Sequence, residues 1–87
     1  MTVFVVLGTA PTTPLEQTIQ TTFPSNFKKI GTGQWLVAAT GITTQELTEK
    51  LGASNGDKGK VLIASVQNFW GWHQSDVWEW IQAKMVK

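Results

Sequence analysis

Residues 27–52 read FKKIGTGQWLVAATGITTQELTEKLG, and the rest of the architecture can be worked out from this stretch. It contains two short segments with strand character, 27–30 and 34–40, separated by Gly-Thr-Gly, which predicts a β-hairpin with a bulge. A helix start follows directly, because Thr43 and Glu46 have the spacing of a capping box. The stretch therefore predicts strand, strand and helix in succession.

The flanking segments extend this pattern in both directions. Residues 2–7 are apolar on both faces and predict a central strand. Residues 13–23 predict a helix, since they open with Thr-Pro-Leu-Glu, a capping-box start with proline at the first helical position. Residues 60–66 predict another strand that is apolar on both faces, and about 75–86 predicts an amphipathic helix whose first residue is a serine N-cap.

The predicted order is β-α-β-β-α-β with an additional C-terminal amphipathic helix. This order is typical of a single α/β (α+β) ferredoxin-like sandwich over residues 1–87, in which an antiparallel sheet has two helices on one face. The first and third strands would be central, and Lys28 and Lys29 would protect a short edge strand. The second sheet face would then be covered by the C-terminal helix, by a second copy of the chain, or by both.

Composition excludes several classes of function. The chain has 87 residues, of which 41% are hydrophobic and 15% charged, and its formal net charge is +1. It has no cysteine and one histidine, which excludes thiolate zinc sites and iron–sulfur clusters and argues against a histidine metal site. All basic residues are lysines, so the arginine forks that commonly bind phosphate and guanine are absent. We expect no cofactor and no metal.

Targeting signals are not evident in the sequence. The apolar run at residues 3–7 is shorter than the core of a signal peptide and has no positive residues before it. No later run approaches the length needed to span a membrane. We therefore expect a cytoplasmic protein without a membrane partner.

Several segments resemble the small ferredoxin-like family of bacterial CRISPR-associated endoribonuclease-like and SinR-like proteins. The resemblance lies in Trp35-Leu36-Val37, the T-x-x-E-L-x-x-x-L-G pattern at 43–52, the strand at 61–66 and Trp70-Gly71. It implies homodimers that pack through their sheets, and metal-dependent phosphodiester cleavage supported by an aspartate after the first strand. That place here reads Leu-Gly-Thr-Ala, without a carboxylate, so the resemblance implies the fold and dimerisation but not the nuclease activity.

Possible catalytic groups have simpler explanations. His73, Asp76 and Glu79 are spaced by three, as a general base with two carboxylates could be. A loop histidine, a helix-start charge and a solvated carboxylate explain these three residues better, and Ser75 is explained as a helix cap. The Gly-Thr-Gly turn lies between two strands rather than before a helix, which argues against a phosphate loop. We expect no catalytic residue and no enzyme activity.

Tryptophan is the most unusual feature of the composition. Four of the five tryptophans lie between residues 70 and 80, and large aromatic side chains are enriched at protein interfaces. The candidate interface residues are Trp70, Trp72, His73, Trp78 and Trp80.

These observations predict a non-catalytic protein–protein interaction module. We expect a homodimer, and a role as a small regulator or inhibitor of a larger complex is consistent with the size and the lack of cofactor motifs. The partner would be a second copy, an unidentified protein, or both. Two alternatives stay open: a degenerate relative of the metal-dependent nucleases that binds nucleic acid, and a sensor of small molecules between protomers. Scattered lysines and the small net charge argue against nucleic acid.

Overall fold

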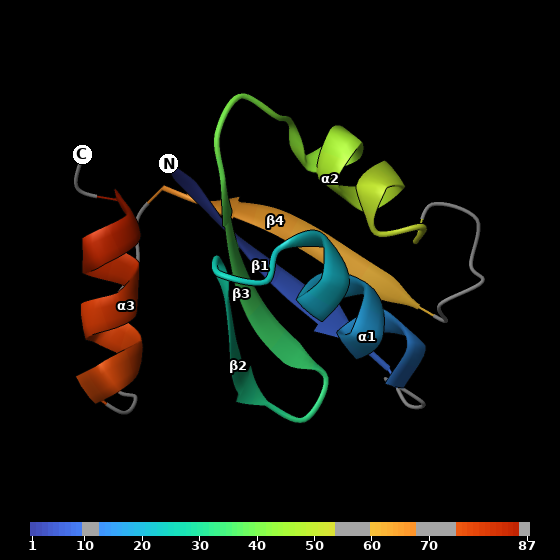
Figure 1. Cartoon of the computed structure of the whole chain (residues 1–87), viewed down its shortest axis with the longest axis horizontal. Helices are drawn as coiled ribbons and strands as arrows, with labels where there is room; N and C mark the ends of the chain where they lie inside the picture. Colours follow the sequence, from blue (N-terminus) through green and yellow to red (C-terminus); the bar gives the residue numbers. More distant parts are fainter. Residues whose placement is uncertain (10–12, 54–59, 68–74, 86–87) are drawn as a thin grey trace.

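The computed structural model describes residues 1–9, 13–53, 60–67 and 75–85 (Figure 1). Four strands and three helices are formed by the described residues. In chain order they are β1 (Thr2–Gly8), α1 (Thr13–Thr22), β2 (Phe27–Gly31), β3 (Gln34–Ala39), α2 (Thr44–Lys50), β4 (Val61–Val66) and α3 (Ser75–Met85). This confirms a mixed α/β chain with the predicted element order.

The strands form one antiparallel sheet with the order β2-β3-β1-β4. The prediction that the first and third strands are central is confirmed. Val5 of β1 lies between Leu36 of β3 and Ala64 of β4, and the same register continues along all three strands. The two edges are therefore β2, which follows α1, and β4, which precedes α3.

The β2–β3 hairpin also has the predicted form. Gly33 adopts a φ of 71°, a left-handed conformation that glycine reaches without the steric cost of a side chain. The pairing register shifts between Lys29 and Gly31, which is the expected bulge. A bulge increases the local twist, and together with two lysines it makes β2 a poor template for further strand pairing.

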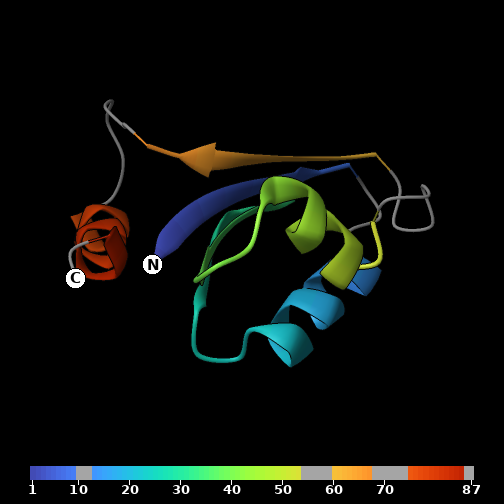
Figure 2. The ribbon, with the colours of Figure 1, turned by 90° about the horizontal axis from the view of Figure 1, so that it is seen from above.

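One face of the sheet is covered by α1 and α2, which lie on the same side in Figure 2. The capping box of α2 is confirmed, since the Glu46 N–H donates to Thr43 Oγ1 at 3.1 Å and the Thr43 N–H donates to Glu46 Oε1 at 2.8 Å. The sequence placed Thr13 at the cap of the first helix, whereas the structure includes it as the first residue of α1. The buried residues of this layer are Phe4, Val6, Leu15, Ile19, Trp35, Val37, Ala39, Leu47, Leu51 and Ala53.

Candidate interaction surface

The second face of the sheet is covered by α3 over part of its area. Val77 and Ile81 of α3 are each 5% exposed, and they share a buried cluster with Val3, Leu36 and Ala38 of the two central strands. In Figure 2, α3 lies apart from the other helices, beside the N-terminal end of β1. The expected contribution of the C-terminal helix to this face is therefore confirmed for one end of the sheet.

Two polar contacts attach α3 to the β2 side of the sheet. Lys28 Nζ lies 2.9 Å from Asp76 Oδ2, and Lys84 Nζ donates to Asn26 Oδ1 at 2.8 Å. The hydrogen bond from Lys28 holds the pKa of the Asp76 carboxyl below its usual range, and the backbone N–H of Val77 acts in the same direction. One contact lies near each end of α3, so together they fix the direction of the helix across the sheet.

The structure places two of the five candidate interface residues. Trp78 and Trp80 are both partly buried on α3. Trp80 packs against the buried cluster of the second face, and Lys84 Nζ lies 5.8 Å from the centroid of its ring. Trp70, Trp72 and His73 lie outside the described residues, so their place in an interface stays a prediction.

An apolar strip remains open on the second face, at the end away from α3. Leu62 of β4 is 64% exposed and Leu7 of β1 is 39% exposed. These two residues are cross-strand partners and share their face with Val3, because side chains alternate along a strand. Ala64, also exposed, lies two residues along β4 on the same face. We call Leu7, Leu62 and Ala64 the open strip.

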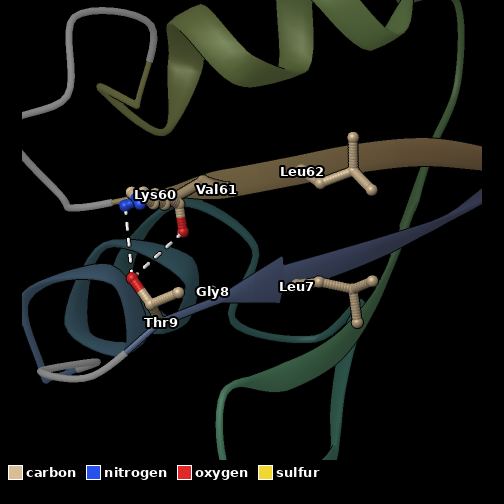
Figure 3. Close-up of a pocket in the computed structure, with 6 residues that line it drawn as sticks. All are labelled: Leu7, Gly8, Thr9, Lys60, Val61 and Leu62. Carbon is tan, nitrogen blue, oxygen red and sulfur yellow. Dashed lines mark hydrogen bonds between the residues drawn. The ribbon is translucent and has the colours of Figure 1, made fainter.

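A shallow pocket of about 300 Å³ continues from the open strip around the ends of β1 and β4 (Figure 3). Its lining consists of Leu7, Gly8, Thr9, Lys60, Val61 and Leu62. The Thr9 hydroxyl oxygen accepts a hydrogen bond from the Lys60 N–H at 3.3 Å and lies 3.5 Å from the Lys60 carbonyl oxygen. Because this hydroxyl is bonded to backbone groups, the lining offers a mostly apolar surface.

The exposed position of Leu62 differs from the prediction for the fourth strand. Residues 60–66 were expected to be covered on both faces, because both of their faces are apolar. In the structure the helix-facing side chains of Val61 and Ile63 pack partly against the core, whereas Leu62 and Ala64 face solvent. The sequence did contain a signal for this exposure. The predicted strand order places residues 60–66 at an edge of the sheet, and the strand has no charged residue after Lys60 to protect that edge.

The described residues contain neither a candidate metal cluster nor a candidate membrane-spanning helix. Within them, no three histidine, aspartate or glutamate side chains come together as a set that could hold a metal ion. No helix in that part of the chain is both long and apolar enough to cross a membrane.

Comparisons with known proteins return no relatives. No family model matches the chain, and neither a curated protein nor a solved structure matches it.

Proposed function

We propose that this protein is a non-catalytic protein–protein interaction module that forms a homodimer and acts as a small regulator or inhibitor of a larger complex. The observation that carries the proposal is the exposure of Leu62 beside Leu7 on the second sheet face. Burying a leucine side chain contributes about 1.5–3 kcal/mol. In a symmetric contact the same leucine is buried in both copies, so its contribution counts twice. An open apolar strip at the edge of a sheet is therefore a natural place for another chain to bind.

The proposal includes a ferredoxin-like architecture. The observed order β2-β3-β1-β4, read from the opposite edge, is 4-1-3-2, and all neighbouring strands are antiparallel. The two βαβ units and the helices α1 and α2 on one face are consistent with this fold. The same features support the resemblance to small ferredoxin-like bacterial proteins, in which dimers form through the sheets.

The non-catalytic part of the proposal rests on the chemistry of the residues. The chain has one histidine and no cysteine, which leaves few choices for a nucleophile and its base. Asp76, one of the carboxylates near His73 in the sequence, is bound to Lys28. The Thr9 hydroxyl of the pocket is bound to backbone groups of Lys60. The Asp76 carboxylate and the Thr9 hydroxyl therefore make contacts that hold parts of the fold together.

The nucleic-acid alternative has less support. Lys28 is paired with Asp76, Lys29 lies 3.2 Å from Glu16, and Lys84 is bonded to Asn26. Nucleic-acid surfaces need free cations arranged along a groove, often with aromatic platforms. Incubation with short RNA and DNA in magnesium or manganese should leave both intact, whereas metal-dependent cleavage would contradict the non-catalytic assignment.

Light scattering over a hundredfold dilution tests the proposed dimer. The wild-type chain has a mass of 9.6 kDa, so a dimer should scatter at twice this mass. Leu62→Glu places a charge on the open strip and should give a monomer that keeps its helix and strand content. Gln17→Glu adds the same charge at an exposed position of α1, on the other side of the sheet, and should remain a dimer. A wild-type chain that is monomeric at every concentration would overturn the proposal.

A further inference from the structure

Strand β4 is an edge of the sheet that the described residues form. Its one neighbour among the described residues is β1, and no described segment pairs with its outer side (Figure 1). A strand in this position leaves a row of backbone N–H and C=O groups without partners in the sheet. The outer side of β4 can therefore bind another strand through its backbone, in addition to the apolar contacts of the open strip.

The hydrogen bonds at the end of β4 show which backbone groups face outward. The Thr9 N–H donates to the Lys60 carbonyl oxygen at 3.1 Å, so the backbone groups of Lys60 point toward β1. These groups alternate along an antiparallel strand. The N–H and C=O groups of Val61, Ile63 and Ser65 therefore point away from β1, toward the open side.

The two edges of the sheet differ in their protection. Edge strand β2 has Lys28 and Lys29 and a bulge, which are the usual means of preventing strand pairing. Strand β4 has the sequence VLIASV, without charge, proline or glycine, and its pairing to β1 runs without a register shift. Only one edge is thus suited to pairing, and a chain with one such edge forms a closed pair rather than a filament.

We propose that β4 pairs in antiparallel orientation with β4 of a second copy, about a two-fold axis at Ile63, to form a continuous eight-stranded sheet. This inference rests on the proposed function. The partner of the open strip would be a second copy of the chain, and the contact would be the pair of β4 strands. In this register Leu62 lies opposite the partner's Ala64 on the second face. Ser65 lies opposite the partner's Val61, and their outward backbone groups form the ladder.

A second copy is favoured because β4 is complementary to itself. The large Leu62 meets a small alanine twice, so each leucine packs against the partner's open strip across the strand pair. Lys60, which precedes the strand, lies at opposite ends of the pair in the two copies, so no like charges face each other. The net charge of +1 per chain adds little repulsion.

Ser65→Pro tests the backbone contact separately from the apolar one. The Ser65 N–H points outward, so proline removes a donor of the dimer ladder without removing one from the β1–β4 ladder. Two symmetry-related hydrogen bonds are lost, and we expect the dimer dissociation constant to rise about thirtyfold. Ser65→Ala keeps the N–H and should leave the dissociation constant unchanged. A Ser65→Pro variant that folds and dimerises as tightly as the wild type would overturn the proposal.

Disulfide cross-linking tests the register and does not depend on the proline variant folding. The chain has no native cysteine, so Leu62→Cys and Ala64→Cys each provide a single thiol. In the proposed register these two positions face each other as a non-hydrogen-bonded pair, with Cα atoms about 4.5 Å apart, which suits a disulfide. A mixture of the two variants should therefore form a disulfide-linked heterodimer faster than either variant forms a homodimer.

The outcomes separate this inference from the proposed function. Faster cross-linking of Leu62→Cys with itself would indicate dimers that stack through the open strip, which would overturn strand pairing and leave the interaction module intact. A monomeric wild-type chain would overturn both. A weaker dimer in Ser65→Pro together with the mixed disulfide would support strand pairing specifically.

Discussion

Ile81→Ala should detach α3 from the sheet while the sheet itself remains folded. Ile81 is 5% exposed and packs with Val3, Leu36 and Ala38. The change removes three carbons, at about 0.8 kcal/mol each, which gives about 2.4 kcal/mol before any cost of the cavity. A cavity brings such losses into the range of about 2–5 kcal/mol. Among the described residues of α3, only Val77 would then remain as a buried apolar contact. Because one such contact holds the helix weakly, we expect α3 to open locally.

Amide hydrogen exchange on each element would measure this detachment. In Ile81→Ala the amides of α3 should lose protection, while those of β1 and β3 keep most of theirs. Leu47→Ala provides a matched comparison, because it removes the same number of carbons from a fully buried residue of α2 on the other face. That variant should lower the protection of the central strands as well. If Ile81→Ala lowers the protection of α3 and of the central strands equally, α3 belongs to the same cooperative unit and the reasoning is wrong.

Three further predictions concern the attachment of α3 and the start of α2. The pKa of Asp76 is lower in the folded chain than in the unfolded one, so its stabilising contribution is complete above about pH 4 and is lost as the pH falls through the depressed value. NMR titration should show α3 loosening on acidification, and Lys28→Met should remove this pH dependence. Thr43→Ala should lower the free energy of unfolding by about 1 kcal/mol and the Tm by about 4–8 °C, while unchanged melting would show that the bond to the Glu46 N–H adds nothing. The ring of Trp80, a candidate interface residue, is partly buried against the second-face cluster of its own chain, so Trp80→Ala should cost about 2 kcal/mol and leave the proposed dimer unchanged; a weakened dimer with unchanged Tm would instead support the place of Trp80 in the interface.

Most of the sheet could be predicted from local sequence signals. The capping box at Thr43 and Glu46 needs only the spacing of two residues, and the structure shows both of its hydrogen bonds. The central position of β1 followed from apolar residues on both of its faces, since water must be excluded from each. These predictions succeeded because each depended on contacts within a few residues or on a simple periodic pattern.

The open strip could not be found in this way. An apolar residue in a strand is equally consistent with a covered and an uncovered face. Leu62 and the buried Leu36 are both leucines within apolar strands, so local sequence does not distinguish them. The difference depends on where α3 crosses the sheet. The apolar contacts of Val77 and Ile81 set this position. The polar contacts of Lys28 with Asp76 and of Lys84 with Asn26 also set it. Those contacts join residues far apart in the chain, and periodicity gives no information about them.

The position of the open strip follows from the size of a helix. A seven-residue strand such as β1 is about 23 Å long, whereas one α-helix is about 10 Å wide. A single helix that crosses the strands therefore covers less than half of their length. Exposure along the second face of β1 follows this geometry, since Val3 is fully buried, Val5 is partly exposed and Leu7 is 39% exposed. In this chain the one helix on this face therefore leaves the far end of β1 exposed. The leucines at that open end, beside an edge strand without charge or proline, are the reason we propose it as a surface for a second chain.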